Sequence, residues 1–160
     1  MDNISFSLAF AAAIASGMVA GVLFAFSAFV MKALGRIPEE QGIAAMQSIN
    51  VTVQNALCAL LFFGTGLASL ALAVVALAQW NSPGMGYLLA GSLFYLIGGL
   101  AVTGAFNVPM NNRLAAVRAD HAGGHAYWKT FQSNWMIWNH VRTVACMAAS
   151  ASFAAALIAQ

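Results

Sequence analysis

Residues 53–79 read VQNALCALLFFGTGLASLALAVVALAQ, a run of 27 positions without a single charged side chain. A helix needs about 20 apolar residues to cross a hydrocarbon core of ~30 Å, so this run is long enough to span a membrane. Three further runs, at about 6–33, 87–106 and 138–159, have the same character. We therefore predict an all-α fold, a bundle of four transmembrane helices.

The composition of the chain supports the same class of protein. Of its 160 residues, 62% are hydrophobic and 6% are charged. A soluble domain usually carries about a quarter charged residues, so the low charged fraction of this chain excludes a soluble domain of this length. The four runs leave no room for another domain, so we expect residues 1–160 to form a single integral membrane domain. The net charge of +2 gives no reason to expect nucleic acid as a partner.

The basic residues predict the orientation of the bundle. Lys32 and Arg36 follow the first helix. The other four lie between helices three and four or at the start of helix four, namely Arg113, Arg118, Lys129 and Arg142. All six then fall on one side, and the positive-inside rule places both termini outside and both long loops in the cytoplasm. We expect the chain in a bacterial inner membrane.

The two long loops are expected to contain short cytoplasmic helices. Pro38 followed by two acids is typical of a first helical turn, which predicts a short helix in the first loop. The second loop is predicted to be helical over 113–120, with residues 123–124, two glycines, as a break.

Small residues are expected to let the four helices pack closely. Gly17 and Gly21 form a G-x-x-x-G step, which favours a compact bundle and leaves a homo-oligomer possible. Cys58 and Cys146 lack the C-x-x-C spacing of a redox pair, so we interpret them as small buried hydrophobic residues.

The last apolar run is preceded by the polar and aromatic stretch WMIWNHVR, residues 135–142. At about 100° per residue, four of its side chains share one helix face, namely Trp135, Trp138, Asn139 and Arg142. His140 lies about 100° farther round from Asn139. Ionisable groups at membrane depth usually have a function. The structural alternative is an interfacial aromatic belt, with Arg142 reaching a lipid phosphate.

A second polar block, FNVPMNNR at residues 106–113, closes the third apolar run. Pro109 cannot continue the helical hydrogen bonds and disfavours a helical residue before it, so we expect a bend near Asn107. The asparagine amides of the block would either satisfy the exposed backbone or point at a ligand. With the last helix opposite, we predict a pocket near the cytoplasmic face. Its candidate binding residues are Asn50, Phe106, Asn111, Asn112, Arg113, Trp135, Trp138 and Asn139.

His121 and His125 in the stretch HAGGH raise the question of a metal site, because imidazole binds several transition metals. Two glycines between them make a regular helical pair doubtful. Apart from Asp120, no nearby carboxylate or cysteine set completes a ligand shell. We interpret the stretch as a solvated loop and predict no metal site.

Four stretches together resemble the anthrone oxygenase-like family of small membrane proteins. They are GVLFAFSAFVM from residue 21, IAAMQSIN from 43, FNVPMNNRL from 106 and WMIWNHVRT from 135. The resemblance covers nearly the whole chain. It implies a four-helix membrane fold and an oxygenase that converts an anthrone to an anthraquinone. A hydrophobic small molecule is then the expected partner besides the bilayer, with dioxygen as co-substrate and no cofactor.

The chemistry that the resemblance implies assigns roles to particular residues. An anthrone has a methylene group between two aromatic rings, and loss of its proton gives an enolate that reduces dioxygen without a metal. Such a reaction needs a base, an oxyanion site and a flat apolar slot. The resemblance implies that His140 is the base and that Arg142 or Arg113, with Asn107, Asn111 or Asn139, stabilises the enolate oxygen. Of these groups, His140, Asn107 and Arg142 are our catalytic candidates. The aromatic side chains of Phe106, Trp135 and Trp138 would stack on the substrate.

Two other functions remain open from the sequence. His140 is a candidate ligand for haem or a transition metal in a membrane oxidoreductase. The polar residues would alternatively serve a small transporter or a lipid-binding scaffold. The scarcity of polar side chains in the outer halves of the helices argues against a transport path.

Overall fold

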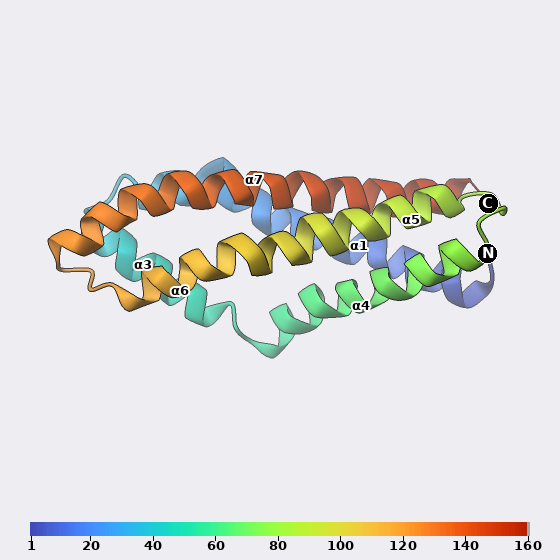
Figure 1. Cartoon of the computed structure of the whole chain (residues 1–160), viewed down its shortest axis with the longest axis horizontal. Helices are drawn as coiled ribbons and strands as arrows, with labels where there is room; N and C mark the ends of the chain where they lie inside the picture. The colour runs from blue at the N-terminus through green and yellow to red at the C-terminus, as the bar shows by residue number, and fades with distance from the viewer. Residues whose placement is uncertain (160) are drawn as a thin grey trace.

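The computed structural model describes residues 1–159, and this part of the chain contains helices and no strand. Residue 160 of the predicted domain lies outside the described residues. Four long helices run side by side (Figure 1). Each is long and apolar enough to cross a membrane, and they are Asn3–Leu34, Ala56–Ala78, Met85–Ala116 and Ala122–Ile158. The predicted all-α fold with four spanning helices is confirmed, and the chain is an integral membrane protein.

Two of the four spans are built from several helical segments, because π-helical turns interrupt the α-helical hydrogen bonds. In chain order the segments of residues 1–159 are α1 (Asn3–Ala25), η1 (Phe26–Val30), α2 (Met31–Leu34), α3 (Glu39–Thr52), α4 (Ala56–Ala78), α5 (Met85–Leu93), η2 (Phe94–Ala101), η3 (Thr103–Asn107), α6 (Val108–Ala116) and α7 (Ala122–Ile158). The first span joins α1, η1 and α2. The third joins α5, η2, η3 and α6.

The third span continues through Pro109, whereas the sequence predicted that this helix would end near Phe106. Val108 is helical, with φ −62° and ψ −47°, and its backbone N–H bonds to the carbonyl of Thr103, five residues earlier. A π turn of this kind widens the helix just before the proline and relieves the clash that a regular turn would impose. The helix therefore runs on to Ala116, and the separate helix predicted over 113–120 is wrong.

The fourth span also differs from the prediction, since α7 begins at Ala122 rather than near Trp138. Its 37 residues extend for ~55 Å at ~1.5 Å per residue, which exceeds the thickness of the hydrocarbon core. The two glycines at 123–124 lie in its first turn and do not break it. The chain leaves the helical path earlier, at residues 117–121.

Two hydrophobic clusters hold the helices together. The larger one joins α1, α4, α5, η2 and α7, and its buried side chains include Leu72, Leu88 and Phe153. The second lies toward the opposite end and joins α2, α3, α6 and α7, with Ile43 and Trp128 fully buried. Between them along the bundle lies a cluster of polar side chains, which we call the buried cluster. Its members are Ser27 in η1, Thr103 and Asn107 in η3, and Asn139 and Arg142 in the middle of α7.

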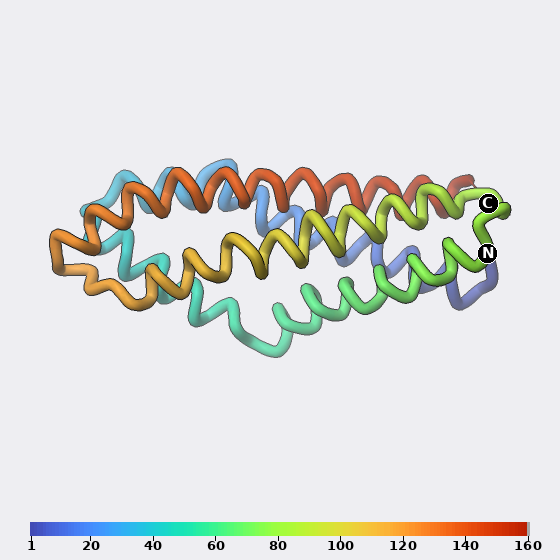
Figure 2. Tube along the Cα trace, in the orientation of Figure 1, coloured from blue at the N-terminus to red at the C-terminus, as the bar shows by residue number. Residues whose placement is uncertain are grey.

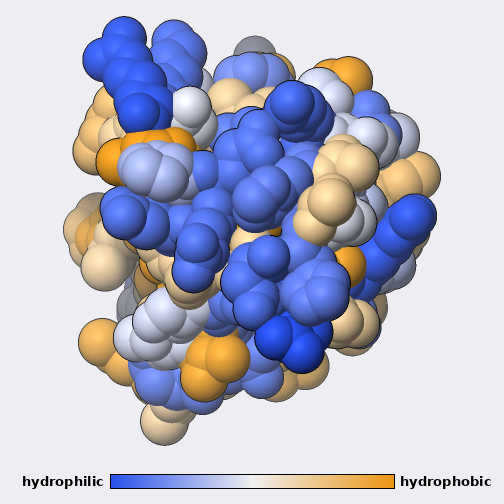
Figure 3. All heavy atoms as spheres, turned by 90° about the vertical axis from the view of Figure 1, so that its left-hand side faces the viewer, coloured by the Kyte–Doolittle hydropathy of each residue, from blue (hydrophilic) through white to orange (hydrophobic). Residues whose placement is uncertain are grey.

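The two ends of the bundle differ in polarity. The start of α1 and the end of α7 lie at one end, whereas α3, α6 and the first turns of α7 form the other (Figures 1 and 2). The face at the α3 and α6 end is largely hydrophilic (Figure 3). Which side of the membrane this end occupies stays a prediction from the basic residues.

Candidate functional site

Asn139 is fully buried in α7 and connects it to the first span. Its Nδ2 donates to the carbonyl of Leu23 at 2.8 Å and to Ser27 Oγ at 2.9 Å. Its Oδ1 accepts a hydrogen bond of 2.7 Å from Arg142 Nη2. Because both the donor and the acceptor of the amide are bonded, the orientation of Asn139 is fixed.

Arg142 is a buried cation, 6% exposed, one turn farther along α7. Its Nη1 donates to Thr103 Oγ1 at 3.2 Å, and the guanidinium carbon lies 5.2 Å from the centre of the Trp135 ring. No carboxylate among residues 1–159 lies within 4 Å of it, and its Nε is buried without a hydrogen-bond partner. Burying a cation without an anion is costly, so the site favours an electron-rich ligand atom.

Asn107, at the end of η3, approaches the same part of α7 and is 1% exposed. Its Nδ2 donates to the backbone carbonyl of Trp135 at 3.3 Å, while its Oδ1 is buried and has no hydrogen-bond partner among residues 1–159. One turn later, Asn111 Oδ1 accepts a 2.8 Å hydrogen bond from the Trp135 indole N–H. The third span therefore holds Trp135 by both its backbone and its ring.

Phe106 and Trp138 lie against each other at the edge of this cluster. Their ring centres are 3.5 Å apart and the ring planes differ by 6°. Phe106 is 38% exposed and Trp138 is half-buried. Since each ring covers one face of the other, a flat substrate has only their outer faces available.

The structure brings together much of what the sequence predicted for this site. Asn107 and Asn111 contact Trp135, and Phe106 contacts Trp138. Three other candidate binding residues lie apart from these contacts. Asn112 and Arg113 are exposed, with the Arg113 guanidinium 4.4 Å from the centre of the Tyr127 ring. Asn50, near the end of α3, has a buried Nδ2 without a partner. The roles of all these residues in binding stay predictions.

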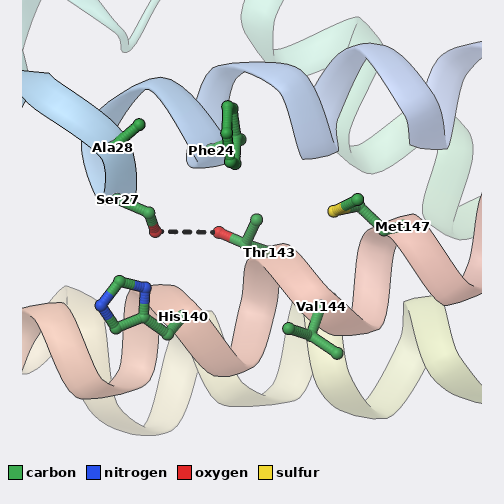
Figure 4. Close-up of a pocket in the computed structure, with 7 residues that line it drawn as sticks. All are labelled: Phe24, Ser27, Ala28, His140, Thr143, Val144 and Met147. Atoms are coloured by element: carbon green, nitrogen blue, oxygen red, sulfur yellow. Dashed lines mark hydrogen bonds between the residues drawn. The ribbon is translucent and has the colours of Figure 1, made fainter.

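His140 does not lie in the buried cluster, in agreement with its expected offset around the helix. It is exposed and lines a hollow of about 290 Å³. The other lining residues are Phe24, Ser27, Ala28, Thr143, Val144 and Met147 (Figure 4). Ser27 belongs to both places, because its hydroxyl reaches Asn139 on one side and lines the hollow on the other.

Ser27 and Thr143 place two hydroxyl groups in the wall of the hollow, 3.3 Å apart (Figure 4). The Thr143 hydroxyl donates to the carbonyl of Asn139 at 2.7 Å, which leaves Ser27 as the donor within the pair. At 3.3 Å this is a long O–H···O hydrogen bond, so the Ser27 proton can turn toward a bound molecule.

Sequence reasoning missed Ser27, Thr103 and Thr143. Hydroxyl groups in helices commonly bond to the backbone of their own helix, so the local sequence does not mark Thr103 and Thr143 as site residues. The only available signal was that Ser27 is the one hydroxyl residue in the otherwise apolar stretch at 21–31.

Of the two histidines in the 117–125 region, His125 is held by other groups. A ring nitrogen of His125, Nε2, lies 2.9 Å from the carbonyl oxygen of Ala119, and Nδ1 lies 3.4 Å from a carboxylate oxygen of Glu39. Within residues 1–159, no group of three or more His, Cys, Asp or Glu side chains is placed to hold a metal ion. His121 is exposed.

Residues 55–152, more than half of the chain, match the profile of the family described as anthrone oxygenase. The chain belongs to the anthrone oxygenase family. The matched residues include Asn107, His140 and Arg142, whereas Ser27 lies outside them. No curated protein and no solved structure matches the chain. The family inferred from the four sequence stretches is confirmed.

Proposed function

We propose that this member of the anthrone oxygenase family is a membrane oxygenase that oxidises a flat, hydrophobic ketone of the anthrone type, or a related phenol, with dioxygen. The observation that carries the proposal is the buried Arg142, which has Asn139 and Thr103 as fixed partners and no carboxylate within 4 Å in residues 1–159. A preorganised cation in apolar surroundings stabilises a developing oxyanion strongly.

Arg142 acts on the hollow through a chain of directed hydrogen bonds. Its Nη2 donates to Asn139 Oδ1, and Asn139 Nδ2 donates to Ser27 Oγ. The Ser27 hydroxyl then donates to the oxygen of the substrate. Every donor in this chain points toward the hollow, and hydrogen bonds in series polarise one another, so part of the arginine charge is felt at the substrate oxygen.

The hollow suits a flat apolar molecule that arrives from the bilayer. Phe24, Val144 and Met147 line it and are more than half exposed on the outer surface of α1 and α7. Because this surface faces the lipid in a spanning bundle, the hollow opens sideways into the membrane. Its volume is at the lower end of the ~300–1,000 Å³ range of small-molecule pockets.

In the proposed reaction, His140 removes a proton from the methylene carbon, since imidazole is a general base near neutral pH. The resulting enolate passes one electron to dioxygen, and the carbon radical and superoxide combine to form a C–O bond. Protonation gives a hydroperoxide. Loss of the second methylene proton and cleavage of the O–O bond release water and leave a quinone carbonyl. One substrate and one dioxygen thus give one quinone and one water.

Dioxygen uptake by the purified protein in lipid nanodiscs, with an anthrone as substrate, tests this function. The rate without protein is subtracted, because anthrones oxidise slowly in solution. We expect His140→Gln to lower the rate at least tenfold, because a side-chain amide cannot act as a general base. His121→Gln is the matched control and should keep the wild-type rate.

Three results would contradict parts of the proposal. Full activity of His140→Gln would show that another group is the base. Absence of uptake and of quinone product in the wild-type protein, with a range of flat phenols and anthrones, would exclude the oxygenase function. A haem absorption band or a stoichiometric transition metal in the active protein would replace the cofactor-free reaction with the metal-dependent alternative.

A further inference from the structure

A second hollow, of about 470 Å³, lies between the end of the first span and α7. Its lining residues are Met31, Lys32, Gly35, Arg36, Gln132, Ser133 and Met136, none of which lines the His140 hollow. The two methionines, one from each helix, give it an apolar part. Met31 is 3% exposed, so this part continues into the core of the bundle. We call this hollow the basic groove.

Two cations border the basic groove without an anionic partner. Lys32 and Arg36 are four residues apart and exposed, and no carboxylate of residues 1–159 lies within 4 Å of either. Glu39, the nearest acid along the chain, is instead 3.5 Å from Lys129 and 3.4 Å from His125. The groove therefore has a net positive charge that the protein itself does not neutralise.

Gln132 adds an uncharged donor to the same wall. Its side-chain amide makes no hydrogen bond within the described residues 1–159, and it lies against Gly35, where an added Cβ would be 2.7 Å from Nε2. The missing side chain at position 35 thus leaves room for the amide beside the two cations. An anionic oxygen in the groove would meet two charges and an N–H donor together.

The position along α7 places the basic groove at a particular depth. Met136 and Gln132 precede Ile158, the end of α7, by 22 and 26 residues, or ~33 and ~39 Å at ~1.5 Å per residue. The hydrocarbon core is ~30 Å thick and the bilayer with its headgroups ~40–45 Å. If Ile158 lies at one boundary of the core, the groove lies in the headgroup layer of the opposite leaflet.

We propose that the basic groove binds the phosphate headgroup of an anionic phospholipid. Lys32 and Arg36 neutralise the phosphate and Gln132 donates to it, while the methionines contact the first part of the acyl chains. A zwitterionic lipid brings its own cation to these two basic side chains, so an anionic lipid is preferred. The proposal is independent of the oxygenase function, because the groove shares no residue with the His140 hollow.

Native mass spectrometry of the full chain, titrated with phosphatidylglycerol or phosphatidylcholine in detergent, tests this site. We expect one phosphatidylglycerol to be retained by the wild-type protein in preference to phosphatidylcholine. The double variant K32Q/R36Q should bind it about thirtyfold more weakly, because each cation near a lipid surface contributes about 1 kcal/mol and 1.4 kcal/mol is a factor of ten. K32R/R36K, which keeps both charges, should retain binding and shows that the position tolerates substitution.

The control variant R118Q/K129Q removes two positive charges from the same end of the bundle outside the groove. It should bind phosphatidylglycerol within about twofold of wild type. Equal losses in the two charge-removing variants would attribute binding to diffuse charge and overturn the site, as would equal affinity of the wild type for both lipids. Displacement of the lipid by an equal concentration of inorganic phosphate would show that the groove takes free phosphate and that the lipid assignment is wrong.

Discussion

The two halves of the bundle satisfy their buried polar groups in different ways. In the half that contains the start of α1 and the end of α7, two buried serines bond to their own helix. Ser16 donates to the carbonyl of Ala12 at 2.6 Å, and Ser92 to that of Leu88 at 2.9 Å. Two further hydroxyl groups of this half donate to a carbonyl of a neighbouring helix, Tyr95 to Phe62 at 2.9 Å and Ser150 to Ala13 at 2.8 Å. All four are neutral groups with a carbonyl partner, and the larger hydrophobic cluster packs closely in this half.

In the other half, the polar side chains bond across helices and are not all satisfied. Asn139 and Arg142 connect α7 to the first and third spans, and Asn107 connects the third span to α7. Two buried atoms in this cluster, Asn107 Oδ1 and Arg142 Nε, have no hydrogen-bond partner within the described part of the chain. The first half has one unpaired buried hydroxyl, on Ser69, but a neutral hydroxyl is far less costly to bury than a cation. Under the proposed function, the half with the unpaired cation holds the reaction site, and the other half contributes mainly to stability.

Replacing Arg142 with methionine should have the largest effect on activity. We expect the oxidation rate to fall about a thousandfold, because the substrate oxyanion loses the charge that stabilises it. The thermal unfolding midpoint should change little, since removing a buried cation without an anion also removes its desolvation cost. Dioxygen uptake and thermal unfolding in the same nanodiscs measure both effects, with Arg118→Gln as control. A large loss of stability with normal activity of the folded protein would make Arg142 a structural residue.

Ser27 and Ser16 offer a matched test of the two halves, because both are serines of the first span. Ser27→Ala should lower the rate about a hundredfold, the effect of removing one donor from an oxyanion site. Ser16→Ala should leave the rate unchanged, since its hydroxyl only bonds to its own helix. The KM and kcat of both variants with an anthrone provide the measurement. Equal effects of the two substitutions would contradict the proposed chain of hydrogen bonds.

The sequence was sufficient for the class of fold and for the meeting of the two polar stretches. Helical spacing placed Asn139 and Arg142 on one face and His140 apart from them, as the structure has it. The sequence was insufficient at Pro109, because a π turn before a proline depends on packing between helices, which local conformational preferences do not determine. The contact of Ser27 with Asn139 was equally out of reach, since it depends on the register between α1 and α7, a tertiary property.

Gly91→Ala tests the half that packs closely and should have a moderate effect on stability. An added Cβ would lie 2.8 Å from a ring carbon of Phe153, which is fully buried and has no free space to move into. We expect a loss of about 2 kcal/mol in the free energy of unfolding, typical of overpacking. Gly21→Ala is the control, because its added Cβ would meet no atom of residues 1–159 within 4 Å beyond its own stretch of helix backbone. Activity per folded molecule should be normal in both variants. A selective loss of activity in Gly91→Ala would contradict the expectation that this half affects stability and not the reaction.

The smallest effect is expected at Arg118, whose surroundings are the opposite of those of Arg142. Arg118 is exposed and donates to both carboxylate oxygens of Asp120, at 3.1 and 2.8 Å. This guanidinium holds the pKa of the Asp120 carboxyl below its usual value. A lowered pKa in the folded state adds stability above the unfolded value of about 3.9, and that stability is lost as the pH falls through the folded pKa.

Arg118→Gln should therefore be slightly less stable than wild type at neutral pH and equal to it in strong acid. The difference is small and decreases with salt, because both side chains of the pair are exposed. Denaturant unfolding between pH 7 and pH 2 measures it. A difference that persisted in strong acid would mean that Arg118 acts through something other than the charge of Asp120. The contrast with Arg142 would then rest on burial alone and not on the presence or absence of a carboxylate partner.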